Sequence, residues 1–181
     1  MSTDVYTERV ETQAGNFAVA VDENGSLLRV AFLDDDRKPG CVQSWDATLE
    51  ALDRRGCKIS QDTARTAAAV RELRDYVEGR RESFSLSLAP QGTKFQQEVW
   101  RMLREIPRGE IRTYSGLAQA AGRPKAARAV GRAVATNPIP IAIPCHRVLG
   151  ADGSLTGFAG GLALKKRLLE IEGFTPGNRP T

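Results

Sequence analysis

The architecture of the C-terminal half depends on one segment, residues 115–135, which reads SGLAQAAGRPKAARAVGRAVA. Residues 115–121 and 125–135 are rich in alanine, which favours helix. The turn between them contains Gly122 and then Pro124, a residue that is tolerated at the start of a helix. Two helices joined by a short glycine-containing turn are typical of the helix-turn-helix motif. The segment therefore predicts a helix-turn-helix unit.

Patterns elsewhere predict a small sheet followed by mainly helical structure. Apolar runs at residues 17–21 and 27–33 flank the pair Asn24-Gly25, which is a strong hairpin signal. An extended segment at about residues 4–12 would add a third strand. Further helices, inferred from apolar periodicity and capping residues, are expected at residues 63–78, 93–103 and 161–172. A short extended segment is expected at residues 84–88.

The charge balance changes sign near residue 90. Residues 1–92 contain 12 Lys and Arg against 16 Asp and Glu, whereas residues 93–181 contain 14 against 6. Turn-forming residues lie at the same point, so we expect two domains, residues 1–90 and 91–181. A basic C-terminal half favours a polyanionic partner such as nucleic acid, although an unevenly charged solvated surface would give the same pattern.

Composition narrows the class of protein. Of the 181 residues, 41% are hydrophobic and 27% are charged, as in soluble globular proteins. No apolar run is long enough to span a bilayer, and the first ten residues are too polar for a signal peptide. The three cysteines cannot all pair with one another. We therefore expect reduced thiols and a cytoplasmic protein, associated with the nucleoid if the source is bacterial.

The strongest candidate for chemistry is the segment IPCHRV, residues 143–148. His146 is the only histidine of the chain and directly follows Cys145, which we expect at the end of a strand braced by the neighbouring prolines. A cysteine is a good nucleophile only as the thiolate, which a nearby base or cation supplies. A third group usually holds such a histidine, and the candidates are Glu170 and Glu172, at the end of the last predicted helix. A bare Cys-His pair is nevertheless more often an inert buried cysteine beside a surface histidine.

The residues around Cys145 resemble the active-site motif of the O6-alkylguanine-DNA alkyltransferases, also called methylated-DNA–protein-cysteine methyltransferases. The resemblance covers nearly all of the C-terminal half, whereas the N-terminal half matches the family only in layout. It implies an α+β fold, in which a ribonuclease-H-like domain of sheet and helices precedes a mainly α winged helix-turn-helix domain. The motifs that carry it are FQQEVW (95–100), IPRGE (106–110), TY (113–114), RPKAARAVG (123–131), NP (137–138), PCHRV (144–148), GFAGG (157–161) and LA (162–163).

This resemblance implies that Cys145 takes a methyl or other alkyl group from O6 of guanine in DNA, or from O4 of thymine, and keeps it. His146 would take the cysteine proton through a water, and Glu172 would orient the imidazole. Tyr114 would donate a proton to the leaving guanine, and Asn137 would brace the turn beside the active site. Packing for Tyr114 and an ordinary Asn-Pro turn for Asn137 are simpler roles that the sequence leaves open.

The resemblance also implies that the second helix enters the minor groove of double-stranded DNA and that the alkylated base is flipped out. Arg128 would fill the hole in the base stack, while small residues would let the helix approach closely, although alanine is also simply a good helix former. Contacts with DNA are expected from Thr113, Tyr114, Arg123, Lys125, Ala126, Ala127, Arg128, Ala129 and Gly131. The cations Arg123, Lys125 and Arg132 would meet either phosphates or only solvent. The pocket is expected to use the carbonyls of Cys145 and Val148, with Gly157, Phe158, Ala159 and Gly160 as a lid.

Two departures from the family pattern matter. The family often has tyrosine-serine in the lid, where this chain has Phe158-Ala159, which leaves the substrate preference open. Some members also hold a structural zinc in the N-terminal domain, but this chain has no histidine there and only Cys41 and Cys57. We therefore expect no metal and no cofactor, and we expect the protein to act as a monomer.

Three other classes of protein compete with an alkyltransferase. Non-catalytic sensors of alkylated DNA keep the fold but replace the cysteine, whereas Cys145 is present here. A winged-helix transcription regulator would need neither the Pro-Cys-His run nor a glycine-rich lid. A thiol hydrolase would use Cys, His and an acid, but the predicted DNA-reading helix would then be unexplained.

Overall fold

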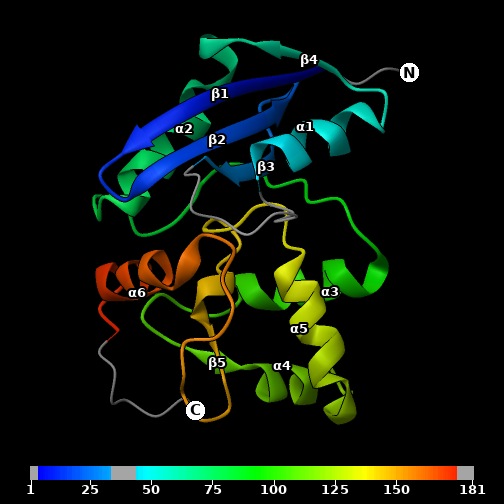
Figure 1. Ribbon diagram of the computed structural model, residues 1–181, viewed down its shortest axis with the longest axis vertical. Helices are drawn as coiled ribbons and strands as arrows, with labels where there is room; N and C mark the ends of the chain where they lie inside the picture. The colour runs from blue at the N-terminus through cyan, green and yellow to red at the C-terminus, as the bar shows by residue number, and fades with distance from the viewer. Residues whose placement is uncertain (1–3, 34–43, 175–181) are drawn as a thin grey trace. The chain divides into compact units, whose positions relative to one another are not determined.

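The computed structural model describes residues 4–33 and 44–174, and the chain can be followed in Figure 1. It forms two compact units. The first contains the described residues up to Gln91 together with Pro138–Ala142, and the second contains Gly92–Asn137 together with the described residues from Ile143 onward. Cys41 lies outside the described residues.

The first unit is built on a four-stranded sheet in the order β3-β2-β1-β4. Its strands are β1 (Asp4–Thr12), β2 (Gly15–Asp22), β3 (Leu27–Phe32) and β4 (Lys58–Gln61). The first three are antiparallel neighbours, whereas β4 runs parallel to β1. The three strands expected from the apolar runs are confirmed, and β4 is a strand that the sequence did not predict.

The turn of the β2–β3 hairpin is stabilised by its own residues, Asp22–Ser26. The backbone of Gly25 has a φ of 77°, a left-handed conformation that a residue without a Cβ adopts at low cost. Oδ1 of Asp22 accepts hydrogen bonds from the amides of Asn24 at 2.9 Å and Ser26 at 2.8 Å. These bonds hold the loop, so the Asn-Gly signal correctly predicted the hairpin.

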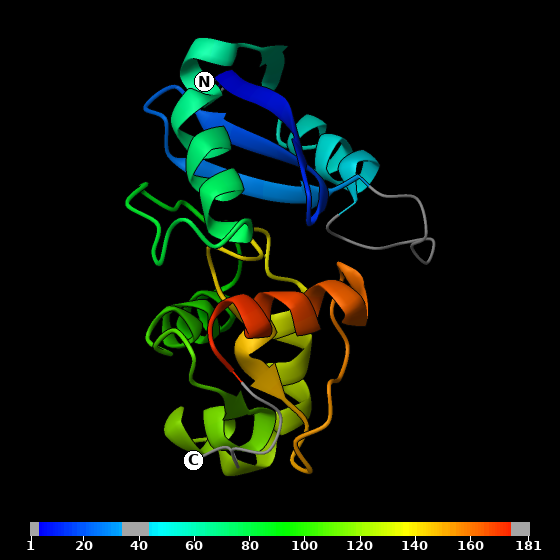
Figure 2. The ribbon, with the colours of Figure 1, turned by 90° about the vertical axis from the view of Figure 1, so that its left-hand side faces the viewer.

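Two helices cover opposite faces of this sheet (Figure 2): α1 (Trp45–Asp53) and α2 (Thr63–Val77). Helix α2 occupies the predicted span, and its first turn is capped by Asp62, whose carboxylate accepts from the amide of Arg65. Helix α1 was not predicted, because its nine residues carry no long apolar period. Its Leu52 packs against Val5 and Ala20 of the sheet.

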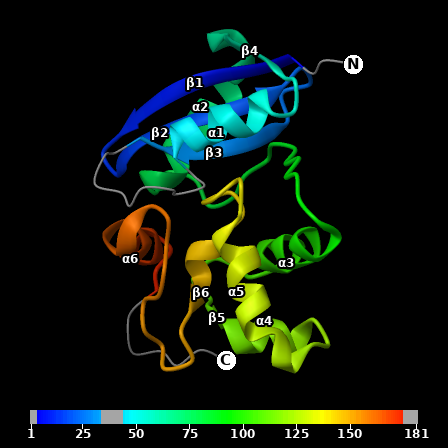
Figure 3. The ribbon, with the colours of Figure 1, turned by 45° about the vertical axis from the view of Figure 1, so that its right-hand side comes forward.

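The second unit is mainly helical. Its helices are α3 (Lys94–Arg104), α4 (Tyr114–Ala120), α5 (Ala127–Ala135) and α6 (Gly161–Ile171). Short strands β5 (Arg112–Thr113) and β6 (Val148–Leu149) form a parallel pair, visible in Figure 3. Helices α4 and α5 confirm the predicted helix-turn-helix. The expected second helix begins with a 3₁₀ turn at Pro124–Ala126 before α5 proper.

Helix α3 is joined to α5 through a buried tryptophan. Thr93 caps α3 in a capping box with Gln96, as the sequence suggested for the start of this helix. The indole Nε1 of Trp100 donates to the carbonyl of Ala133, 2.8 Å away, so the indole both packs and satisfies its polar atom. This hydrogen bond anchors α5, the helix predicted to contact DNA, to α3.

The local structure around Cys145 differs from the prediction. We expected Cys145 at the end of a strand, but it begins a 3₁₀ turn, Cys145–Arg147, and β6 starts only at Val148. Pro144 has φ −78° and ψ 64°, which interrupts extended backbone, and its carbonyl accepts from the amide of Arg147 at 3.0 Å. The segment at residues 84–88 is likewise not a strand; only Leu88 makes a bridge, to Leu27.

Candidate active site

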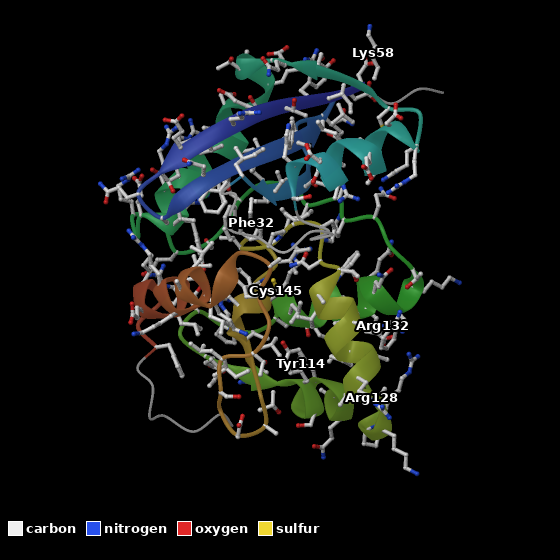
Figure 4. The ribbon with its side chains drawn as sticks, in the orientation of Figure 1. Phe32, Lys58, Tyr114, Arg128, Arg132 and Cys145 are labelled. Atoms are coloured by element: carbon white, nitrogen blue, oxygen red, sulfur yellow. The ribbon has the colours of Figure 1, made fainter. Side chains whose placement is uncertain are left out.

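Cys145 is held in a buried turn of the second unit, beside α6 (Figure 4). Its amide donates to the carbonyl of Ile143, 2.7 Å away, and Nδ2 of Asn137 donates to the same oxygen at 2.9 Å. Asn137 is fully buried. The predicted bracing position of Asn137 therefore has a geometric basis: it holds the backbone two residues before the candidate nucleophile.

His146 is fully buried and contacts Glu172, the residue that caps the end of α6. The distance from His146 Nε2 to Glu172 Oε1 is 2.5 Å. An ionised carboxylate only accepts hydrogen bonds, so Nε2 carries the hydrogen and the lone pair of the neutral ring is on Nδ1. Nδ1 has no hydrogen-bond partner among the described residues. Glu170, the other acid near the end of α6, is exposed and lies 3.7 Å from Lys166.

Burial, hydrogen bonds and neighbouring charges together set the protonation of His146 and Glu172. Burial lowers the pKa of His146, and the hydrogen bond and charge of Glu172 only partly oppose it. Burial alone would raise the pKa of Glu172, but the hydrogen bonds and charges of His146 and Arg147 outweigh it and hold this pKa well below its ordinary value. At neutral pH the pair is therefore a neutral imidazole beside a carboxylate, which is the state that can accept a proton.

Arg147 is a member of the site that we did not predict. Its Nε donates to Glu172 Oε2 at 2.8 Å and its Nη2 to Oε1 at 3.1 Å, while Nη1 donates to the carbonyl of Ile106 at 2.5 Å. The signal was present in the sequence, because Arg147 belongs to the PCHRV motif. Nothing in that motif shows that its side chain meets an acid 25 residues away.

Tyr114 begins α4, immediately after β5, and its ring is half-buried. Burial raises the pKa of its phenol, and the charge of Cys145 raises it further, while the nearby Thr156 side chain partly offsets the rise. The phenol therefore stays protonated at neutral pH. A protonated hydroxyl that senses the charge of Cys145 is suited to donating a proton to a leaving group.

Lys165 of α6 is a second unpredicted member of the site, and it is fully buried. Its Nζ donates to the carbonyl of Val148 at 2.6 Å and to that of Thr156 at 2.7 Å. Burial lowers the pKa of Lys165, and the charge of Cys145 partly offsets this effect, so that the pKa is about 8. The Val148 carbonyl that we expected to meet the guanine amine is thus already engaged, with one lone pair left.

The expected lid precedes α6. The ring of Phe158 meets the ring of His146 edge to face, with centroids 6.4 Å apart. Of the lid glycines, Gly161 has a positive φ of 83°, whereas a Cβ built at Gly157 would meet nothing within 4 Å. The sharp turn at the end of this segment therefore depends on Gly161. Ala159 and Gly160 are half-buried.

The expected DNA contacts lie on or beside α5. Figure 4 shows Arg128 and Arg132 along this helix, and Lys125 stands one turn before Arg128; all three side chains are exposed. None of the three makes an ion pair within the described part of the chain. Ala129 is exposed, while Ala126, Ala127 and Gly131 are half-buried.

Two other expected DNA contacts have roles inside the unit. Oγ1 of Thr113 caps α4 by accepting from the amide of Gly116. The guanidinium of Arg123 lies 5.1 Å from the ring centroid of Phe95 and 3.7 Å from Glu98. These contacts stabilise the start of α4 and join Arg123 to α3. The DNA contacts of both residues stay predictions.

Residues 4–33 and 44–174 contain no group of three or more His, Cys, Asp or Glu side chains that would hold a metal ion. Cys57 is half-buried and packs beside Val5, Ala20 and Leu52. None of the helices in these ranges has the length and apolar character needed to cross a membrane.

Comparisons with known proteins match both halves of the chain. Residues 94–174 match the family model described as 6-O-methylguanine DNA methyltransferase, DNA binding domain, and residues 5–90 match the one described as 6-O-methylguanine DNA methyltransferase, ribonuclease-like domain. A methylated-DNA–protein-cysteine methyltransferase of Methanosarcina barkeri is 57% identical over 168 residues, covering 93% of this chain and 97% of that protein. The protein of the same name from Methanosarcina acetivorans is 43% identical over 169 residues, with coverage of 93% and 99%.

Solved structures give the same result. The crystal structure of Mycobacterium tuberculosis OGT in complex with DNA matches with a TM-score of 0.75 and 35% identity, covering 92% of each chain. The structure of the Mycobacterium tuberculosis O6-methylguanine methyltransferase matches with a TM-score of 0.74 over 96% of each chain. These matches confirm the family and the α+β fold that the sequence predicted. The chain belongs to the 6-O-methylguanine DNA methyltransferase family.

Proposed function

We propose that this protein repairs DNA by direct reversal, taking the alkyl group of O6-alkylguanine onto Cys145. The observation that carries the proposal is a buried cysteine directly followed by a histidine that Glu172 holds at 2.5 Å, in a chain of this family. The relatives are named methylated-DNA–protein-cysteine methyltransferases, and a structural neighbour was solved with DNA. The enzyme is a methylated-DNA–protein-cysteine S-methyltransferase.

The reaction begins with proton transfer from the Cys145 thiol. The buried Nδ1 of His146 is the basic atom of the ring, and we assign it the cysteine proton, received through a water. Glu172 stabilises the imidazolium that forms, in the manner of the acid in other nucleophile–base pairs. The cation of Lys165 adds a second favourable charge, since a cation near a cysteine favours the thiolate.

The thiolate then attacks the alkyl carbon. A carbon–sulfur bond forms, the bond from carbon to guanine O6 breaks, and its electron pair stays on the guanine. Tyr114 donates a proton to the leaving base, which the raised pKa of its phenol allows. The product is a thioether and an intact guanine. No group in the site returns the thiol, so each molecule acts once.

Access to a base inside duplex DNA requires flipping. We propose that α5 lies in the minor groove, that Arg128 replaces the flipped base, and that Lys125 and Arg132 meet phosphates. The exposure of Arg128 and Arg132 on α5, and of Lys125 in the 3₁₀ turn before it, supports this role.

The deciding experiment measures the intact mass of the full chain after incubation with duplex DNA carrying one O6-methylguanine. We expect a gain of one methyl group, located on Cys145, with at most one equivalent transferred per protein. Cys145→Ser should bind the DNA and gain nothing, while the matched control Cys57→Ser should react like the wild type. An unchanged wild-type mass would favour a non-catalytic sensor, and repeated turnover would favour a hydrolase; either result would reject the proposal.

A further inference from the structure

The carboxylate of Glu172 is shared between two cationic or potentially cationic neighbours. Oε1 lies 2.5 Å from Nε2 of His146 and 3.1 Å from Nη2 of Arg147, while Oε2 lies 2.8 Å from Nε of Arg147. The side chains of Glu172 and His146 are 0% exposed, and that of Arg147 is 9% exposed. In a dry environment such contacts are strong only when each partner is held in place.

Arg147 is itself anchored at a third point. Its Nη1 donates to the carbonyl of Ile106 at 2.5 Å, in the segment that follows α3. The same segment reaches the end of α6 again through Arg108, whose Nη2 donates to the carbonyl of Ile171 at 2.5 Å. Gly109 has a φ of 78°, and a Cβ there would be 3.0 Å from the carbonyl of Glu172. Residues 106–109 therefore hold the end of α6 and the guanidinium together.

We propose that Arg147 is a positioning residue for alkyl transfer, whose fork-shaped guanidinium fixes the Glu172 carboxylate so that His146 is held as the Nε2–H tautomer with Nδ1 as its basic atom. The catalytic consequence rests on the proposed function, whereas the arrangement of the three side chains does not. A planar guanidinium can bind both carboxylate oxygens and a carbonyl at once, which an ammonium cannot do with the same geometry.

Charge supports the same role. Burial lowers the pKa of His146, and the charges of Arg147 and Lys165 lower it further. Glu172 acts in the opposite direction and raises it. Cys145 is the neighbour of His146 in the chain, and the ring of Phe158 lies at 80° to the imidazole ring. Removal of Arg147 would take away a positive charge beside the ring and favour the imidazolium. An imidazolium has no lone pair, so it cannot accept the cysteine proton.

The test uses the fact that His146 is the only histidine of the chain. In full-length protein labelled with ¹⁵N-histidine, the two ring nitrogens report tautomer and protonation without assignment of other signals. We expect the wild type to show a neutral Nε2–H ring at pH 7. In Arg147→Gln the titration midpoint should move upward by about one pH unit, the effect of one nearby charge. The acid limb of the single-turnover rate should move by the same amount.

Arg147→Lys keeps the charge but loses the fork, so we expect a mixture of tautomers or a slower reaction with a smaller shift in midpoint. Arg101→Gln, which removes an exposed arginine of α3 paired with Glu105, should leave the histidine signals unchanged. If Arg147→Gln does not fold, the tautomer of the wild type and the Arg147→Lys spectrum still decide the matter. An Nδ1–H ring in the wild type, or wild-type histidine signals in the Arg147 variants, would overturn the inference.

The two proposals fail separately. A wild type that gains its methyl group while Arg147→Gln and Arg147→Lys show unshifted histidine signals would reject the role of Arg147 alone. A wild type that gains no methyl group would reject alkyl transfer, whatever the histidine signals show.

Discussion

Nδ2 of Asn137 donates a hydrogen bond to the carbonyl oxygen of Ile143, 2.9 Å away, in a fully buried environment. The residues between them, Pro138–Ala142, belong to the other compact unit. The bond therefore closes the chain at the point where it returns to the second unit, two residues before Cys145. Backbone placement of the nucleophile depends on a side chain eight residues earlier.

Loss of this bond should weaken both folding and chemistry. Asn137→Ala removes the donor from a buried carbonyl, and we expect a loss of about 1–3 kcal/mol in the free energy of unfolding. Asn137→Asp keeps the shape but replaces the donor with an ionised acceptor, so it should be at least as damaging. Urea denaturation of both variants measures the effect, and wild-type stability in Asn137→Asp would contradict the bracing role.

Gly92 should tolerate no side chain. A Cβ at this position would lie 2.5 Å and 2.7 Å from two ring carbons of Trp100, a buried ring that is tied to Ala133. We expect Gly92→Ala to lower the free energy of unfolding by about 1–3 kcal/mol through overpacking. Gly157→Ala is the matched control for stability, because a Cβ there meets nothing within 4 Å. Equal melting temperatures for the two variants would count against this packing.

Tyr114 should speed the chemical step through its hydroxyl. Tyr114→Phe keeps the ring and its packing but removes the proton donor, so we expect single-turnover methyl transfer to slow on the order of 100-fold. DNA binding should change little. Tyr6→Phe, in β1 of the first unit, is the control and should react at the wild-type rate. A Tyr114→Phe protein as fast as the wild type would assign Tyr114 to packing alone.

Arg128 should speed repair only when the alkylated base must be flipped out of a duplex. Arg128→Ala should slow repair of O6-methylguanine in double-stranded DNA more than it slows reaction with the free alkylated base. The control Arg71→Ala removes an exposed arginine of α2 and should affect neither reaction. Equal losses on the two substrates would show that Arg128 does not act in base flipping.

Acid should remove the contribution of Glu172 to stability. Its pKa in the folded protein is below the ordinary value of 4.5, so its contribution is present above about pH 4.5 and is lost as the pH falls through the folded pKa. The difference in unfolding free energy between wild type and Glu172→Gln should therefore shrink as the pH falls below about 4.5. Urea titrations from pH 7 to pH 3 measure it, and a constant difference would refute this linkage.

Several features could be predicted because they depend on neighbours in the chain. The Asn24-Gly25 hairpin, the capped start of α3 and the helix-turn-helix at residues 115–135 are local, so backbone preference and spacing were enough. Helix α1 and strand β4 escaped prediction for the opposite reason. Strand β4 has one strongly apolar residue, Ile59, and it is a strand because it pairs with β1, some fifty residues earlier.

The sequence by itself determined the motif around Cys145, the presence of a single histidine and the basic character of the C-terminal half. From the residues alone, Glu170 and Glu172 were equally good candidates for the acid that holds His146. Only the tertiary structure decided between them, because α6 ends with Glu172 turned inward and Glu170 exposed. It alone revealed Arg147 and Lys165 as members of the site, since their partners lie 9 to 41 residues away in the chain. Such contacts follow from how helices and loops pack, and no local pattern of residue types encodes them.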